Sequence, residues 1–368
     1  MSPGSSALLL FLTLFGLPLA GHTRCLPPPA ELTQNIRLEA GCTYHQGIRI
    51  SHAVTLDCAG AVFDGGGTLT HGLVIDSRGE TLSGVMVRNC SFRNFSHDGV
   101  LIHWGLPNAQ KLSRYPDPDE PYRRAPQDIL LENVRVEANA VMGIAVDDYV
   151  QRVTLDHVAV IDNPGWGIYW DNASRGNRLL HSEVRGNGHG TAFGKPGLSI
   201  DASTDNQVID TRFENNGRAG IALYRNCQEL AASNPDSIPR ETGANRNLIL
   251  GNSFRDEAVG IWLAARQSQD VSRMQCGRPA YAEGRYVEDE ARENVIARNH
   301  FKALRGHAIL VEDDANALLD NQFEHGTNAI LIGTPIRSRV LQHPVRDTLL
   351  HGNAAGDGIE PVHLLDAD

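Results

Sequence analysis

Side chains that can transfer protons or bind cations recur at one place in a repeated five-residue unit. The unit is a glycine, an apolar residue, any residue, a second apolar residue and a polar fifth residue, as in Gly143-Ile-Ala-Val-Asp147. Carboxylates repeated in this way could act as general acids and bases or bind a divalent cation. The fifth residues of successive units are Asp76, His103, Asp147, Asp171, Asp201, Tyr224, Ala264 and Glu312.

The unit returns at intervals that fit a solenoid. Its ten copies begin 25, 27, 44, 24, 30, 23, 40, 48 and 21 residues apart, and a second short alternating run precedes most of them. Such a repeat of strands and turns is typical of proteins that stack one coil on the next. The short intervals predict single coils of a parallel β-helix, and the long ones predict coils with an insertion. We therefore predict an all-β fold of about ten coils.

The expected layout follows from this repeat. Residues 7–20 form an apolar run that is too short to span a membrane and is typical of a secretory signal. A buried N-terminal cap is the alternative for this run. We predict a signal peptide over 1–20, an N-terminal cap over 21–46, the β-helix over 47–362, insertions over 104–127, 226–245 and 265–293, and a C-terminal tail over 363–368.

Alternation along each strand predicts which side chains face the interior. The second and fourth residues of the unit are apolar and should point inward, so the third and fifth should point outward. We expect the residue just after the unit to join the outer columns, which would expose Trp104, Asp148, Asn172 and Arg225. The residues expected inside are Ile144, Val146, Ile168, Trp170, Leu198, Ile200, Ile221, Leu223, Ile261 and Leu263.

The three insertions all follow this same strand. They should rise from one edge of the rod, beside the acidic column, and loops on one face of a repeat protein usually flank its binding face. Stacked carboxylates would repel one another unless something binds them. The alternative is that Asp is simply common where a strand enters a turn.

Several chemistries suit the column. Carboxylates on neighbouring coils would lie about 5 Å apart and those on alternate coils about 9.6 Å apart, which brackets both glycosidase geometries. Asp147, Asp171 and Asp201 could then supply an acid and a base. With Asp148, the same residues could bind Ca²⁺, whereas His103 would be needed for a transition metal such as copper, the less favoured choice.

Tyr224 and Arg225 follow Asp201 by one coil. A tyrosine can carry a proton, and an arginine can hold a carboxylate through a bidentate contact. Together they would suit proton abstraction beside a uronate carboxylate, although a surface tyrosine and a solvated arginine are the alternative. The candidate catalytic residues are therefore His103, Asp147, Asp171, Asp201, Tyr224 and Arg225, and the candidate sugar-binding residues are Trp104, Tyr169, Asn172 and Trp262.

Charge and cysteine content restrict the partners and the compartment. The net charge of −11 argues against nucleic acid and anionic lipid as partners. We expect a polysaccharide as the partner, no membrane association and a monomer. Six cysteines suit an oxidising compartment. The pairs Cys25–Cys42, Cys58–Cys90 and Cys227–Cys276 are one hypothesis among 15 pairings, and free buried thiols are the alternative.

The repeat resembles the right-handed parallel β-helix superfamily, which includes pectate lyases, polygalacturonases, mannuronan C5-epimerases and NosD-like proteins. The resemblance covers nearly all of the predicted mature chain. Ser96-His97-Asp98-Gly99 is similar to a polygalacturonase motif, but Gly188-His189-Gly190 lies several residues ahead of its expected place. His103 is similar to the epimerase histidine, with Leu101 and Trp104 at the positions of two family aspartates.

This resemblance implies a right-handed, single-stranded β-helix in a secreted or periplasmic protein that acts on polysaccharide. The preferred expectation is lyase or C5-epimerase action on a uronate-containing glycan. Glycoside hydrolysis by paired aspartates is the second expectation. The third is a periplasmic metal- or glycan-binding protein without catalytic activity, as the NosD-like members suggest.

Overall fold

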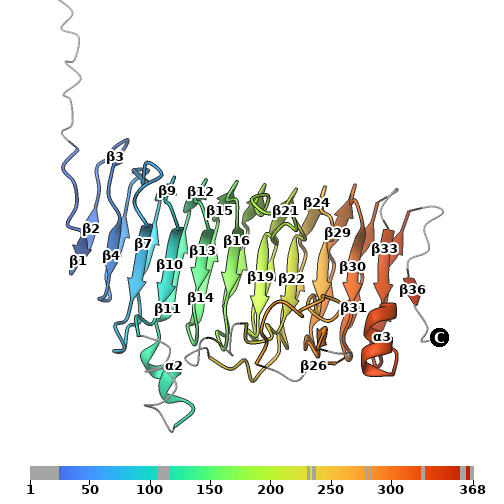
Figure 1. Cartoon of the computed structure of the whole chain (residues 1–368). Coiled ribbons are helices and arrows are strands. Elements are labelled where there is room, and N and C mark those ends of the chain that lie inside the picture. The colour runs from blue at the N-terminus through green and yellow to red at the C-terminus, as the bar shows by residue number, and fades with distance from the viewer. Residues whose placement is uncertain are drawn as a thin grey trace, which may run out of the picture.

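The computed structural model describes residues 25–106, 117–229, 233, 238–277, 280–281, 284–324, 328–356 and 362–364. Within these residues the chain forms three long parallel sheets that run side by side along a rod (Figure 1). Each strand pairs with its counterpart in the preceding and following coil, as in the pairing of Asp98 with His71 and Met142. The predicted parallel β-helix is therefore confirmed.

The first sheet carries the repeated unit and has 12 strands in the described part of the chain. Its strands are β1 (Glu31–Leu32), β4 (Ile48–Ile50), β7 (His71–Asp76), β10 (Asp98–His103), β13 (Met142–Val146), β16 (Trp166–Trp170), β19 (Leu198–Asp201), β22 (Ile221–Tyr224), β25 (Ile261–Leu263), β30 (His307–Val311), β33 (Asn328–Ile332) and β36 (Val362–Leu364).

The second and third sheets each have 11 strands over the same described ranges. The second contains β2 (Ile36–Arg37), β5 (Thr55–Asp57), β8 (Met86–Arg88), β11 (Gln127–Glu132), β14 (Gln151–Asp156), β17 (Arg178–Leu180), β20 (Gln207–Ile209), β23 (Leu248–Leu250), β28 (Val295–Ala297), β31 (Ala317–Leu319) and β34 (Leu349–His351). The third contains β3 (Thr43–Tyr44), β6 (Val62–Asp64), β9 (Ser91–Arg93), β12 (Arg135–Glu137), β15 (Ala159–Ile161), β18 (Glu183–Arg185), β21 (Arg212–Glu214), β24 (Ser253–Arg255), β29 (His300–Lys302), β32 (Gln322–Phe323) and β35 (Ala354–Ala355).

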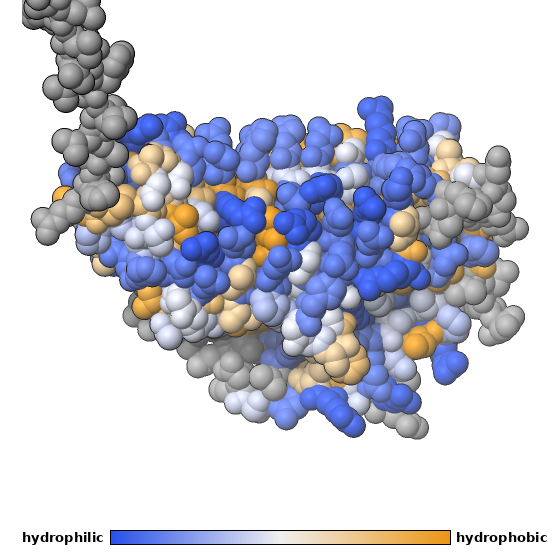
Figure 2. All heavy atoms as spheres, turned by 90° about the horizontal axis from the view of Figure 1, so that it is seen from above, coloured by the Kyte–Doolittle hydropathy of each residue, from blue (hydrophilic) through white to orange (hydrophobic). Residues whose placement is uncertain are grey.

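The predicted inward register of the first sheet is correct. The ten apolar residues expected inside are all fully buried in one core cluster, which includes Ile144, Trp170 and Leu263. A slip of one residue would have turned every one of these side chains outward. The surface seen in Figure 2 is mainly hydrophilic, with scattered hydrophobic patches, as expected when the apolar residues fill the coils.

Rows of buried asparagines stabilise the turns. After the strands of the third sheet, Asn139, Asn163, Asn187 and Asn216 stack one per coil. The amide of Asn163 donates to the Asn187 side-chain oxygen at 2.8 Å, and the Asn163 backbone N–H donates to the same oxygen at 3.1 Å. Each amide therefore satisfies buried groups of the neighbouring coil, as buried polar groups require. Glu257 takes the next place in this row.

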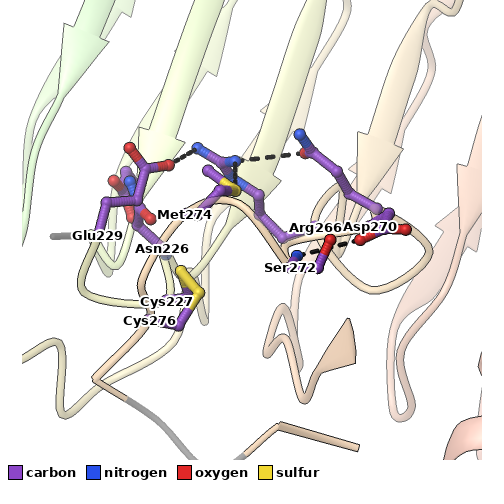
Figure 3. The surroundings of a disulfide bond; sticks show 10 residues. Asn226, Cys227, Glu229, Arg266, Asp270, Ser272, Met274 and Cys276 are labelled. Carbon is purple, nitrogen blue, oxygen red and sulfur yellow. Dashed lines mark hydrogen bonds and ion pairs between the residues drawn. A yellow bond between two sulfur atoms is a disulfide. The ribbon is translucent and has the colours of Figure 1, made fainter. Parts of the chain in front are cut away.

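Three disulfides join Cys25 to Cys42, Cys58 to Cys90 and Cys227 to Cys276. The predicted pairing is confirmed, and the alternative of free thiols is wrong for the described residues. The first bridge lies at the N-terminal end, and the second joins neighbouring coils. The third joins two of the insertions, so it ties together segments that the sheets themselves do not connect (Figure 3).

The ends and insertions differ in part from the expected layout. Strands β1, β2 and β3 form a first coil, so residues 31–44 belong to the solenoid although we assigned 21–46 to a cap. The insertions carry α2 (Glu120–Arg124) and the hairpin β26 (Ala280–Tyr281) and β27 (Tyr286–Val287), all below the first sheet in Figure 1. Helix α3 (Pro335–Leu341) follows β33. The predicted signal peptide, residues 1–20, lies outside the described residues, as does most of the predicted tail.

Among the described residues, we find no helix with the length and apolar character needed to cross a membrane.

Candidate functional site

A long groove follows the outer face of the first sheet from β7 to β25. Its volume is about 1440 Å³, which exceeds the range of roughly 300–1000 Å³ that is usual for small-ligand pockets. Its walls include residues from the insertions and from the turn before β19, among them Phe193, Glu229 and Met274. A groove of this size suits an extended ligand such as an oligosaccharide better than a small metabolite.

Six of the predicted site residues line this groove: His103, Asp147, Tyr169, Asp171, Tyr224 and Trp262. All come from third and fifth positions of the repeated unit, which alternation points away from the core. Strand pairing stacks Tyr169 between Ala145 and Ser199, and aligns Asp201 with Tyr224. The sequence pattern therefore predicted the face on which the groove lies.

The Asp201 side chain also points out of the coil, but other residues cover it, so that it is fully buried and does not line the groove. The Tyr169 hydroxyl donates to one carboxylate oxygen at 2.6 Å, and the Asn226 backbone N–H donates to the other at 2.9 Å. Arg240 approaches both oxygens at 3.2 Å. The insertion after β22 thus covers this carboxylate, so Asp201 can orient Tyr169 but is shielded from a ligand.

Arg240 partly neutralises the negative charge of the stacked aspartates. Its guanidinium contacts Asp171 at 2.7 Å in addition to Asp201, so one cation from an insertion bridges two stacked carboxylates. Burial nevertheless raises the pKa of Asp171 to about 8. The positive charge of Arg240 lowers this pKa, but the nearby carboxylates of Asp148, Asp201 and Asp147 raise it further. A carboxyl group with such a pKa can exchange a proton near neutral pH.

The predicted Ca²⁺ ligands come together only in part. Asp147, Asp148 and Asp171 offer oxygens within 4.8 Å of one another, but the Asp201 oxygens are already bound as described above. Arg240 also occupies one side of Asp171. Oxygen donors suit Ca²⁺, yet a resident guanidinium supplies the positive charge that these carboxylates need. The residues therefore fit a Ca²⁺ ion poorly.

Two tyrosine hydroxyls meet on the floor of the groove. The Tyr224 hydroxyl lies 3.5 Å from that of Tyr169. Burial raises the pKa of Tyr224 to about 12, with a further contribution from Asp201. Burial also raises the pKa of Tyr169 well above its usual value. Both phenols therefore keep their protons at neutral pH and can act as proton donors.

Beside these tyrosines the groove is rich in cations. The side chains of Lys195, Arg218 and Arg266 lie over the rings of Trp166, Trp262 and Tyr224, at 4.2, 4.9 and 5.3 Å from the ring centroids. Burial lowers the pKa of the Lys195 ammonium, and the charges of Arg266 and Arg218 lower it further. These three residues, the cation cluster, therefore affect one another electrostatically.

Only one member of the cation cluster has a carboxylate partner among the described residues. Arg266 contacts Glu229 at 2.7 Å and Gln269 at 3.3 Å, beside the Cys227–Cys276 bridge (Figure 3). Lys195 and Arg218 form no ion pair with any residue that the structure describes. Positive charge gathered in a groove in this way is favourable when an anionic ligand enters it.

Four residues that we expected on the outer face do not lie there. Trp104 is fully buried in the core cluster, and Asn172 is buried with its amide donating to the Pro239 carbonyl at 3.3 Å. Asp148 is buried, and none of these residues lines the groove. Arg225 is 8% exposed and binds Glu290 at 2.7 Å. Of these residues only Trp104 packs in the core cluster, whereas the insertion residues Pro239 and Glu290 contact Asn172 and Arg225.

The sequence reasoning missed Lys195, Arg218, Arg240 and Arg266. Arg218 and Lys195 lie in the turns before β22 and β19, and the other two lie in insertions, so none belongs to the repeated unit. A search for basic residues just before each unit would have found Lys195, which precedes Pro196-Gly197, and Arg218, which precedes Ala219-Gly220. We find no comparable signal for Arg240.

Comparison with known proteins supports the fold. The family described as right handed beta helix region matches residues 71–236. A mutant of the periplasmic alginate epimerase AlgG has 13% identity and a TM-score of 0.55, with 91% of this chain and 73% of that chain covered. The Azotobacter vinelandii mannuronan C-5 epimerase AlgE6 A-module has 13% identity and a TM-score of 0.49, with 88% and 80% covered. Comparison with curated protein sequences finds no match. The family match and the AlgG structure thus support a right-handed parallel β-helix fold.

Proposed function

We propose that this protein is an enzyme that modifies a uronate-containing polysaccharide, by β-elimination or by C5-epimerisation. The observation that carries the proposal is the cation cluster, because Lys195 and Arg218 lack ion-pair partners among the described residues in a chain of net charge −11. A uronate carboxylate would supply the missing negative charge. The groove beside the cluster is long enough for several sugar units, and the structurally similar AlgG is a periplasmic alginate epimerase.

The cation cluster would favour removal of the proton at C5. The carboxylate attached to C5 carries a negative charge that opposes a developing carbanion, and nearby cations stabilise the charge that forms. In β-elimination, a base takes H5, the C5–H electrons form the C4=C5 double bond, the C4–O4 bond breaks and an acid protonates O4. In epimerisation, the electrons delocalise into the carboxylate and C5 receives a proton on the opposite face.

We assign the base to Asp171 and the acid to the tyrosine pair. Asp171 lines the groove and is the carboxyl group whose pKa of about 8 lets it accept a proton in mildly alkaline solution. Tyr169 and Tyr224 also line the groove and keep their protons until much higher pH. Asp201 would position Tyr169 through the 2.6 Å hydrogen bond.

The two alternatives have less support. Hydrolysis needs two carboxyl groups that both reach the glycosidic bond, and Asp201 is covered by Arg240 and Asn226. Asp147 and Asp171 both line the groove, so hydrolysis stays the second candidate. A binder without activity would use the same groove, and the presence or absence of product distinguishes it.

We also propose that the protein is secreted or periplasmic and acts as a monomer. Its three disulfides favour an oxidising compartment.

The test is incubation with a panel of uronate-containing and neutral polysaccharides. Absorbance of unsaturated uronates would report elimination, NMR of the C5 configuration would report epimerisation, and new reducing ends without unsaturation would report hydrolysis. Binding without any product would contradict an enzymatic role.

A pair of arginine variants locates the substrate carboxylate. Arg218→Gln should raise KM for the uronate substrate roughly 10–100-fold, because a charge-assisted contact of about 1.5–3 kcal/mol is lost. Arg225→Gln is the matched control, because Arg225 binds Glu290 away from the groove. It should lower the Tm and leave KM unchanged. A larger KM effect from Arg225 than from Arg218 would contradict the proposed carboxylate subsite.

A further inference from the structure

A second cluster of reactive side chains lies at the opposite end of the groove from the cation cluster. His71 begins β7, Asp98 begins β10, and the two are aligned neighbours in the first sheet. His97 directly precedes Asp98. All three line the groove, and each offers one ligand atom within 4.8 Å of the others. The repeat therefore brings two imidazoles and one carboxylate together, which is a metal-ligand set.

Two of the three separations between the ligand atoms are close to those around a bound metal. Nδ1 of His97 lies 2.9 Å from Oδ2 of Asp98, and Nδ1 of His71 lies 3.4 Å from the same oxygen. With bonds of about 2.0–2.2 Å to zinc, neighbouring ligands lie roughly 3.0 Å apart in octahedral and 3.4 Å apart in tetrahedral geometry. Small shifts of these side chains would place a metal ion between them.

Burial supplies a second, independent observation. Asp98 is 2% exposed, and its Oδ1 has no hydrogen-bond partner within the described structure. Nδ1 of His71 is likewise buried without a hydrogen-bond partner. Leaving such groups unsatisfied costs about 1–3 kcal/mol each, and more for a charged group. A bound cation would satisfy the carboxylate and both imidazoles at once.

We propose that His71, His97 and Asp98 bind a divalent transition metal ion of the Zn²⁺ class. Imidazole nitrogen favours Zn²⁺, Cu²⁺, Ni²⁺ and Fe²⁺ over Ca²⁺ and Mg²⁺, which take oxygen ligands. Three protein ligands leave a coordination position open, as in metal sites that bind water or substrate. Since all three residues line the groove, the open position faces the space that a glycan would occupy. The proposal stands independently of the reaction assigned to Asp171.

The chain contains a matched control cluster. Asp156, His157 and His181 have the same composition, and both Nδ1 atoms lie 2.9 Å from one oxygen of Asp156. This carboxylate is 27% exposed, and none of its atoms is among the buried unpartnered groups of the described residues. The cluster does not line the groove. These side chains are open to solvent, which can satisfy them, so we expect them to bind metal much more weakly.

The experiment uses the full-length oxidised protein without a polyhistidine tag, dialysed against a chelator. Titration with ZnCl₂ by calorimetry should show one site per chain, and addition of Co²⁺ should give the visible absorption of a ligated ion. His71→Ala/His97→Ala should weaken Zn²⁺ binding more than about tenfold, because two of three ligands are lost. His157→Ala/His181→Ala should leave the affinity unchanged. Excess Ca²⁺ should not compete.

Two outcomes would overturn the proposal: no stoichiometric binding of Zn²⁺ or Co²⁺ by the unaltered protein, or equal loss of binding in the control variant. If the double variant fails to fold, His71→Gln serves as a second test variant, because it keeps the polar character of the site. Its circular dichroism melting curve would show a folded protein, and its Zn²⁺ affinity should still fall. Because the readout is metal binding, failure here leaves the proposed reaction untouched, and failure to find product leaves the metal site untouched.

Discussion

Two rows of polar residues run along this solenoid, one residue per coil, and their chemistry makes them behave differently. The row of Asn139, Asn163, Asn187 and Asn216 is self-complementary, because each amide carries both a donor and an acceptor. The row of Asp147, Asp171 and Asp201 has acceptors only when ionised, so it depends on donors from elsewhere, namely Arg240, Tyr169 and the Asn226 backbone. The amide row therefore stabilises the rod, whereas the carboxylate row places Asp147 and Asp171 in the lining of the groove.

The largest expected effect is on turnover, when a carboxylate of the acidic row is replaced by an amide. Asp171→Asn should lower turnover on a confirmed uronate substrate by about 10²–10⁴ if Asp171 transfers the C5 proton. The unaltered enzyme needs ionised Asp171, so its activity should rise as pH increases through about 8. This rise should vanish in the residual activity of the variant. A variant with near-normal turnover and the same pH profile would place the base elsewhere, with His103 and Asp147 the next groups along the groove.

The reverse substitution, an aspartate for an asparagine of the amide row, should destabilise the fold. In Asn187→Asp, the donor to the Val160 carbonyl at 2.9 Å and to the Asn216 side chain at 3.1 Å is lost, and a buried charge is added. We expect the free energy of unfolding to fall by about 3 kcal/mol at pH 7. Chemical denaturation measures this change. Asn133→Asp, at an exposed position, is the control and should change stability by less than about 0.5 kcal/mol. Equal effects at both positions would show that the row has no special role.

The smallest effect concerns the place where the amide row already contains a carboxyl group. Glu257 is fully buried and accepts from Asn216, and burial raises its pKa to about 8. The folded state thus binds this proton more tightly than the unfolded state, whose pKa is near 4.5. The protonated Glu257 side chain should therefore contribute fully to the free energy of unfolding below pH 4.5, and this contribution should decline as pH rises to about 8.

Glu257→Gln should therefore stabilise the protein increasingly as pH rises from 4.5 to about 8 and have little effect below pH 4.5. Melting temperatures across this pH range test the prediction. Glu132→Gln, at an exposed position of β11, is the control. A stabilisation that does not depend on pH would contradict a raised pKa at Glu257.

The sequence was sufficient for the fold and for the face that carries the groove, for a physical reason. Alternation with a period of two is a local property, so the burial of Ile144 or Trp170 can be predicted without knowing any long-range contact. The coil repeat then aligns residues such as Tyr169 and Asp171 along one face. The disulfide Cys58–Cys90 was predictable on the same basis, because the two cysteines follow β5 and β8, which are neighbouring strands of the second sheet.

The charge balance of the site could not be predicted in this way. Arg240 and Arg266 come from insertions, whose paths do not follow the repeat. Without Arg240, Asp171 and Asp201 looked like a free acid–base pair. Arg225 was misplaced for the same reason, because its side chain binds Glu290, a residue of an insertion, and does not line the groove.

The bridge between Cys227 and Cys276 implies an order of assembly for this protein during its synthesis. The coils need only the preceding coil to stack upon, so they can form as the chain emerges. Cys227, by contrast, is made 49 residues before its partner, and the Glu229–Arg266 contact beside the bridge joins the same two segments. The scaffold would therefore be complete through β25 before the binding wall closes. A newly made chain could be folded and still lack a finished groove until its thiols are oxidised.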